Sequence, residues 1–155
     1  MFMTKLKDIT IFFNGTDMQS TVYRYSRNES LPTPLKRAYL LAQNTQGLYY
    51  LVYNAKHEKW GLPGGHIEEH ESVEQTLNRE LQEEVGFPPA TYEISYVLAH
   101  NGARTEYEVI CTGTLSDQPS SISGPEESIS SVAVMPKEKA LEHLKPRDLW
   151  ETILS

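Results

Sequence analysis

The segment from Val73 to Val85 constrains the fold more than any other part of the chain. Its apolar side chains recur every four residues, the spacing of one face of an α-helix. They are Val73, Leu77, Leu81 and Val85. Ser72 and Gln75 form a capping-box pair at the start, and Gly86 is the residue type expected just after a helix ends. We therefore predict a helix over Val73–Val85 that packs its apolar face on a sheet.

The same helix carries three carboxylates, Glu80, Glu83 and Glu84, on one face. Like charges four residues apart destabilise a helix, and anions near its C-terminal end oppose its dipole. The sequence has no Lys or Arg between Glu80 and Gly86. We expect the missing positive charge to be a divalent cation and not a side chain, because Mg²⁺ and Mn²⁺ select oxygen ligands. On the carboxylates alone, the alternative is a solvated acidic face.

Alternating apolar and polar runs elsewhere predict β-strands. The main predicted strands span residues 9–13, 21–25, 37–42, 48–53, 91–100, 105–113 and 128–135. Asn101 and Gly102 predict a hairpin turn between the strands at 91–100 and 105–113. Pro136 and Pro146 each suit the first position of a short helix. Strands and helices are mixed without strict alternation, so we predict an α+β fold in which helices pack on a mixed sheet.

The composition limits the classes of function. At 155 residues the chain is expected to form one domain, residues 1–155. A net charge of -7 argues against non-specific binding to nucleic acid or to an anionic membrane. It also means that a phosphorylated substrate needs a local source of positive charge. The single cysteine, Cys111, excludes an internal disulfide, and the first apolar run is too short for a signal or a membrane span. We expect a cytoplasmic protein.

The stretch from residue 65 to 87 resembles the signature of the Nudix hydrolases, G-x5-E-x7-R-E-U-x-E-E-x-G-U, in which U is a bulky apolar residue. Every specified position is matched at the right spacing. The matching residues are Gly65, Glu71, Arg79, Glu80, Leu81, Glu83, Glu84, Gly86 and Phe87. The preceding stretch, WGLPGG, is also similar to the family. Such a match is too specific to be accidental at an ordinary composition.

The resemblance implies an α/β/α sandwich with a mixed central sheet and a metal-dependent pyrophosphohydrolase. The metal ion, Mg²⁺ or Mn²⁺, is expected to bind Glu80 and Glu84, with Glu83 as a further ligand that also takes part in catalysis. The backbone carbonyl of Gly64 or Gly65 is expected to complete the coordination sphere.

Three further groups of residues are assigned by the same resemblance. Arg79 is expected to fork onto Glu71 and to organise the catalytic site. Glu127 is the candidate general base and Glu126 the second choice; a reading of both as solvated loop acids stays open. The histidines near the glycines are expected to be exposed polar residues and not zinc ligands. They are His57, His66 and His70.

The substrate implied is a nucleoside diphosphate linked to another group. A nucleoside triphosphate or similar small nucleotide is our first choice, because the stretch GARTEY, residues 102–107, lacks the proline of ADP-ribose hydrolases. ADP-ribose, a nucleotide sugar or a dinucleoside polyphosphate stays open. A non-catalytic nucleotide-sensing domain is a further alternative, and an isoprenoid diphosphate isomerase is disfavoured by the position of Cys111. The oligomeric state is left open, with a homodimer as one option.

The assignment of the general base predicts the behaviour of a substitution. Glu127→Gln should lower kcat by roughly ten- to a thousandfold, because a carboxamide cannot accept the proton of the attacking water. Steady-state kinetics of Glu127→Gln beside Glu126→Gln would measure this. An unchanged kcat in Glu127→Gln would move the role of base to another residue.

Overall fold

Strands and short helices make up the computed structural model, which describes residues 3–13, 15–86, 89, 91–115 and 129–154. The strands in this part of the chain are β1 (Thr4–Phe13), β2 (Thr16–Arg24), β3 (Leu35–Gln43), β4 (Tyr49–Asn54), β5 (Lys59–Gly61), β6 (Gly64–His66), β7 (Thr91–His100), β8 (Glu106–Thr114) and β9 (Ile129–Met135). The helices are α1 (Val73–Glu84), α2 (Lys137–His143) and α3 (Arg147–Leu154).

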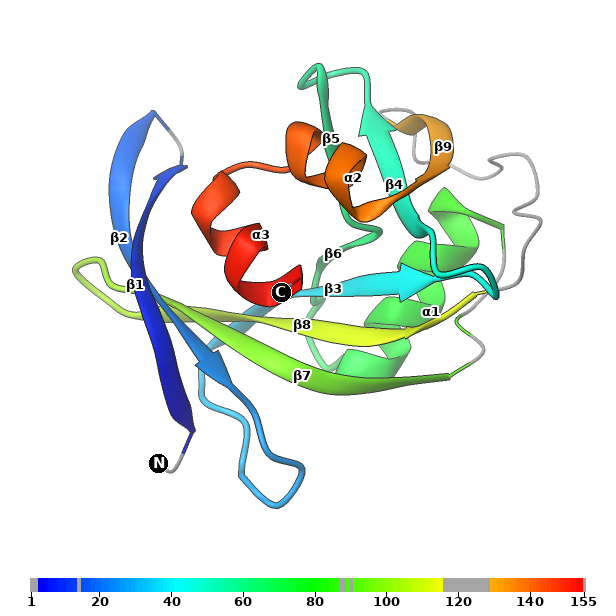
Figure 1. Cartoon of the computed structure of the whole chain (residues 1–155). Coiled ribbons are helices and arrows are strands. Elements are labelled where there is room, and N and C mark those ends of the chain that lie inside the picture. Colours follow the sequence, from blue (N-terminus) through cyan, green and yellow to red (C-terminus); the bar gives the residue numbers. More distant parts are fainter. Residues whose placement is uncertain (1–2, 14, 87–88, 90, 116–128, 155) are drawn as a thin grey trace.

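The strands form one mixed sheet (Figure 1). Its order is β1-β2-β7-β8-β3-β4-β5, with β6 paired to β3 and β9 paired to β4. Strands β3 and β8 run parallel, whereas β3 pairs antiparallel with β6 and β4. The predicted mixed sheet is thereby confirmed. β3 joins the parallel and antiparallel parts of the sheet.

Helices cover both faces of this sheet (Figure 1). On β3, Leu40 belongs to the core under α1, whereas the next residue, Leu41, belongs to the core under α2 and α3. Ile110 and Cys111 on β8 divide in the same way. Successive side chains of a strand point to opposite faces, so each alternating run supplies two cores. This arrangement confirms the α/β/α sandwich.

Helix α1 begins and ends where its capping signals predicted. Ser72 accepts a hydrogen bond from the backbone N–H of Gln75, whose side chain accepts one from the backbone N–H of Ser72. Val85 is the C-terminal cap, and Gly86 follows with a φ of 95°, a conformation that favours glycine. The position of α1 is therefore set largely by its own sequence.

Some boundaries differ from the predictions. Strand β1 starts at Thr4 and not at residue 9, because its polar first half pairs with β2 as far as Arg24. The connection between β7 and β8 is five residues long, 101–105, one residue longer than the predicted strand limits imply. Pro136 is the N-cap of α2 and not its first helical residue. The first difference arises because pairing with a second strand decides where β1 begins.

Across the described residues, none of the helices is long and apolar enough to span a bilayer.

The packing of α1 predicts a clear difference between two neighbouring substitutions. Leu77 is fully buried under the sheet, so Leu77→Ala should lower the free energy of unfolding by about 2–5 kcal/mol. The exposed neighbour Asn78 provides the control, since Asn78→Ala should change it by less than about 0.5 kcal/mol. Urea unfolding followed by circular dichroism measures both. Equal effects would contradict the proposed packing.

Candidate active site

Two adjacent glycines bring the chain close to both the sheet and helix α1. Gly64 has a φ of 134°, and a Cβ there would lie 2.2 Å from the backbone oxygen of Ala38 on β3. A Cβ on Gly65 would lie 2.6 Å from Oε1 of Glu80. Gly64 therefore permits the close contact of β6 with β3, and Gly65 leaves the space that the Glu80 carboxylate occupies.

The carboxylates of α1 lie against this glycine segment. The backbone N–H of Gly64 donates a hydrogen bond of 2.7 Å to Oε1 of Glu84. Glu84 is only 4% exposed and Glu80 only 8%. Burying a carboxylate this well costs folding free energy unless it is hydrogen-bonded or paired with a cation. Glu83, the third carboxylate, is more accessible, with a side chain that is 25% exposed.

Arg79 binds several groups at once. Its Nε and Nη2 donate to the two carboxylate oxygens of Glu71 at 2.8 and 2.9 Å, so the expected fork is present. Nη2 also donates to the backbone oxygen of His66, and Nη1 donates to Glu80 at 3.0 Å. The guanidinium lies 4.0 Å from Glu83 as well. Arg79 thus ties the loop before α1 and the end of β6 to the acidic face of the helix.

The contact between Arg79 and Glu80 corrects one expectation. We expected the charge that offsets the acidic face to come from a metal ion and not from a side chain. The guanidinium of Arg79 supplies part of it, at the position just before Glu80. Arg79 lies just before the span from Glu80 to Gly86, so a count of charges within that span does not reveal this contact.

The residues present suit a hard divalent cation by their chemistry. Glu80, Glu83 and Glu84 share one face of α1, and β6, which carries Gly64 and Gly65, packs against this helix. Among the described residues, no three His, Cys, Asp or Glu side chains converge tightly enough to mark a metal cluster. The oxygen donors and the buried negative charge of Glu80 and Glu84 nevertheless suit such an ion. The assignment of its ligands is a proposal.

A cleft of about 680 Å³ opens beside these residues. Gly64 and Glu84 line it, together with side chains from the β1–β2 hairpin, the sheet and the α2–α3 segment. Its charged and aromatic lining includes Phe12, Arg37, Tyr39, Lys59, Trp60, Glu108, His143, Lys145 and Trp150. The sequence analysis missed these residues. The alternation of the predicted strands could have indicated Arg37 and Glu108, because each lies on the same side of its strand as residues of a core.

Tyr39 forms part of the cleft wall near the carboxylates. Burial raises the pKa of its hydroxyl above the ordinary value, and the nearby Glu108 carboxylate raises this pKa further. The Tyr39 hydroxyl therefore keeps its proton at neutral pH and can donate a hydrogen bond.

The other predicted residues divide into three groups. Glu126 and Glu127 lie outside the described residues. The three histidines near the glycines are exposed, as expected; they are His57, His66 and His70. Cys111 is buried in the core under α1, where burial raises the pKa of its thiol to about 12. A thiol held in its protonated form is a poor nucleophile, so Cys111 serves as a packed core residue.

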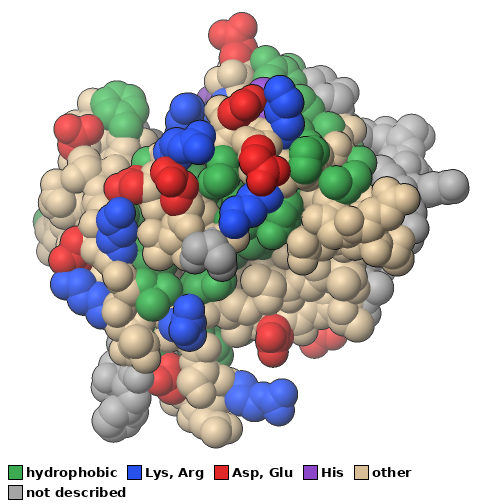
Figure 2. Space-filling model, in the orientation of Figure 1, with side chains coloured by type: hydrophobic (Ala, Val, Ile, Leu, Met, Phe, Trp, Pro, Cys, Tyr) green, Lys and Arg blue, Asp and Glu red, His purple; other side chains and the backbone are tan. Residues whose placement is uncertain are grey.

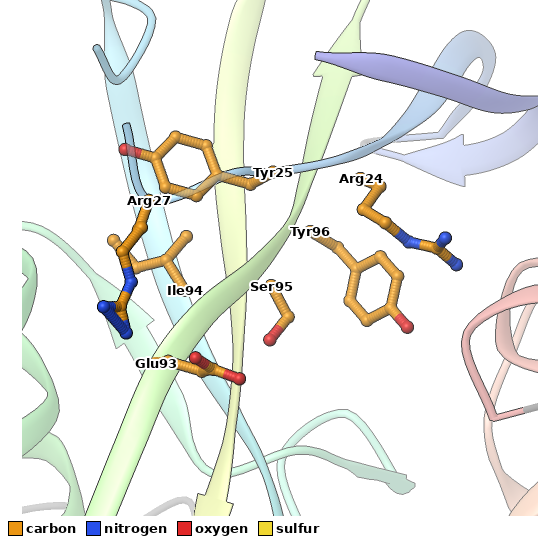
Figure 3. Close-up of a pocket in the computed structure, with 7 residues that line it drawn as sticks. All are labelled: Arg24, Tyr25, Arg27, Glu93, Ile94, Ser95 and Tyr96. Carbon is orange, nitrogen blue, oxygen red and sulfur yellow. The ribbon is translucent and has the colours of Figure 1, made fainter. Parts of the chain in front are cut away.

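A second, shallower groove lies apart from the cleft (Figure 3). Its lining residues are Arg24, Tyr25, Arg27, Glu93, Ile94, Ser95 and Tyr96. None of them also lines the cleft. The guanidinium groups of Arg24 and Arg27 point away from each other (Figure 3), so this groove does not focus its positive charge on one point.

Comparison with known proteins identifies the family. The family model described as NUDIX domain matches residues 33–153. The RNA pyrophosphohydrolase of Hahella chejuensis is 35% identical over 78 residues, which cover 45% of this chain and 48% of that protein. The protein of the same name from Haemophilus influenzae is 37% identical over 57 residues, with 37% and 29% covered. The chain thus matches about half or less of the length of these curated relatives.

Solved structures share the fold. The NUDIX domain of Shewanella oneidensis NrtR, solved with ADP ribose, has a TM-score of 0.63 and 26% identity, and the alignment covers 84% of this chain and 92% of that chain. The Bacillus subtilis pyrophosphohydrolase BsRppH has a TM-score of 0.64 and 13% identity, with 84% and 77% covered. At 13% identity the second likeness concerns the fold alone.

The ion pair between Arg79 and Glu71 predicts a pH-dependent contribution to stability. The hydrogen bonds from Arg79 lower the pKa of Glu71 to about 2, below the ordinary value near 4.5. A lowered folded-state pKa stabilises the protein above pH 4.5, and this stabilisation is lost as the pH falls towards 2. Allowing for solvent screening, Glu71→Gln should cost about 1–2 kcal/mol at pH 7.

Urea unfolding of Glu71→Gln at pH 7 and at pH 3 measures this contribution. The difference from the unchanged protein should shrink at pH 3. Glu69→Gln is the matched control, because the Glu69 side chain is exposed and should contribute little at either pH. A difference that stays constant with pH would contradict the role of the Glu71 carboxylate.

Proposed function

The chain belongs to the Nudix family, and we propose that it hydrolyses a phosphoanhydride bond in a nucleoside diphosphate derivative with the help of a divalent metal ion. One observation supports this proposal most strongly. Two nearly buried carboxylates, Glu80 and Glu84, lie against the segment Gly64–Gly65, and Glu84 and Gly64 line a cleft. A diphosphate in that cleft would lie next to the acidic face of α1.

Glu80 and Glu84 are the proposed principal ligands of the metal ion. Glu83 and the backbone carbonyl of Gly65 are the proposed further ligands, in agreement with the oxygen-rich chemistry that Mg²⁺ and Mn²⁺ select. When bound, the ion supplies the charge that neutralises a diphosphate and lowers the pKa of an attacking water.

Arg79 and Glu71 are proposed to position these ligands. The guanidinium holds Glu71 through two hydrogen bonds and Glu80 through a third. It thereby limits the rotamers open to the Glu80 carboxylate, and rigid ligands raise the precision of a catalytic site. Glu127 stays the proposed general base, and Glu83 is proposed to share in catalysis.

A nucleoside triphosphate is the proposed first substrate. The names of the curated relatives add the triphosphate end of an RNA as a second candidate, since its reacting group has the same chemistry. The NrtR domain solved with ADP ribose keeps that ligand open, along with a purely binding role. Nucleotide sugars and dinucleoside polyphosphates complete the set of substrates to compare.

A substrate panel in Mg²⁺ tests the proposal. It should contain ATP, an RNA with a 5′-triphosphate, ADP-ribose, a nucleotide sugar and a dinucleoside polyphosphate, with products separated by chromatography. Hydrolysis should stop in excess chelator, and Glu84→Gln should reduce kcat by about a thousandfold or more, since a carboxamide is a much poorer ligand for a hard cation.

Glu74→Gln is the control for the loss of one carboxylate from the same helix. Glu74 is exposed in the first turn of α1, so this variant should keep near-normal activity. Full turnover in chelator would overturn the metal assignment. Binding of a panel member without any turnover would favour a nucleotide-sensing domain.

A further inference from the structure

A row of four polar side chains crosses adjacent strands on the α2–α3 face of the sheet. From β2 to β7, Ser20 Oγ lies 2.8 Å from His100 Nδ1. From β7 to β8, His100 Nε2 lies 3.2 Å from Glu108 Oε1. From β8 to β3, Glu108 Oε2 lies 3.9 Å from Arg37 Nη1. The polar row is therefore continuous from Ser20 to Arg37.

Strand register sets this order. Ser20 pairs with His100, and Arg37 pairs with Glu108. His100 and Glu108 are diagonal neighbours, since His100 pairs with the residue two positions before Glu108. Each contact thus follows from backbone pairing, so the register of the sheet determines the polar row.

The polar row lies beside an apolar row on the same face. Two residues along from each polar side chain, the strands contribute Val22, Leu98, Ile110 and, on β3, the partly buried Tyr39 to the core under α2 and α3. The side chains of His100, Glu108 and Arg37 are only 11–17% exposed. Placing charges here costs desolvation energy, and apolar residues of similar size would often be no less stable. This cost points to a role other than stability.

The end of the polar row lies in the cleft. Arg37 and Glu108 both line it, as do Tyr39, Gly64 and Glu84. On the molecular face that carries α2 and α3, basic and acidic side chains are intermixed (Figure 2). An anion in the cleft therefore depends on individual cations and not on a broad positive surface.

We propose that Arg37 binds a phosphate group of the substrate and that Glu108, held by His100 and Ser20, positions its guanidinium. This inference rests on the proposed function only in that the cleft is taken to hold a nucleotide. Five N–H donors allow a guanidinium to bind a carboxylate and a phosphate at once. Contact with Arg37 also offsets the negative charge of Glu108, which would otherwise repel the phosphate.

Binding of ATP tests the role of Arg37 separately from catalysis. Isothermal titration in chelator, and again in Mg²⁺, gives the Kd without relying on turnover. Arg37→Gln should raise the Kd about 10- to 100-fold, the loss expected for hydrogen bonds to a charged group. Arg37→Lys should recover part of the lost affinity, since lysine keeps the positive charge but lacks the forked N–H donors of the guanidinium. If the panel shows turnover of ATP, KM should rise with kcat nearly unchanged.

Arg27→Gln is the matched control, because Arg27 is exposed and lies in the second groove. It removes the same charge and should leave the Kd unchanged. An equal loss in both variants, no loss in Arg37→Gln, or no binding of ATP to the unchanged protein in either condition would overturn the inference. A melting curve of each variant, with Arg37→Lys as the milder change, separates lost binding from lost folding.

A double-mutant cycle tests the positioning role of Glu108. Glu108→Gln should raise the Kd by about 3- to 10-fold, and the variant with both Arg37→Gln and Glu108→Gln should match Arg37→Gln alone, because Glu108 acts through Arg37. Effects that multiply, or tighter binding in Glu108→Gln, would overturn the positioning role. The proposed function fails separately, through absence of hydrolysis in the panel.

Discussion

The contact between α1 and the glycine segment is the interaction on which the site depends. The backbone N–H of Gly64 binds the Glu84 carboxylate, and Gly65 leaves the space that Glu80 fills. A side chain at Gly64 would push β6 away from β3, and one at Gly65 would displace the Glu80 carboxylate. Glu84 thus fastens the helix to β6 and also lines the cleft. Packing and proposed chemistry use the same atoms.

This double use explains how a helix tolerates an acidic face at its C-terminal end. A backbone N–H stabilises one carboxylate, and the guanidinium of Arg79 stabilises another while binding Glu71. One guanidinium shared among several carboxylates leaves the region negative overall. That remaining charge would attract a divalent cation, and it would repel a bare diphosphate. The local cations of the cleft therefore matter for the substrate as much as the acidic face matters for the metal.

Prediction from the sequence succeeded where the signals are local. The limits of α1 follow from Ser72, Gln75 and Gly86, and the two cores follow from the alternation along the strands. The contact of Arg79 with Glu80 and the polar row were not predicted. Ser20 and His100 lie 80 residues apart in the chain, and only the pairing of β2 with β7 brings them together. Which strands become neighbours is a property of the whole fold.

Strand β3 links these non-local features. Through Gly64 and Gly65 it pairs with the segment that carries the proposed metal site, and through Glu108 it pairs with the polar row. β3 therefore holds Arg37 at a fixed spacing from Gly64 and Gly65, which contact the acidic face of α1. A shift of β3 by one residue would turn Arg37 and Tyr39 towards the core under α1 and bring Ala38 and Leu40 into the cleft. Because such a shift would bury a charge in one core and expose apolar residues in the cleft, the stability of the sheet itself keeps the cleft residues in register.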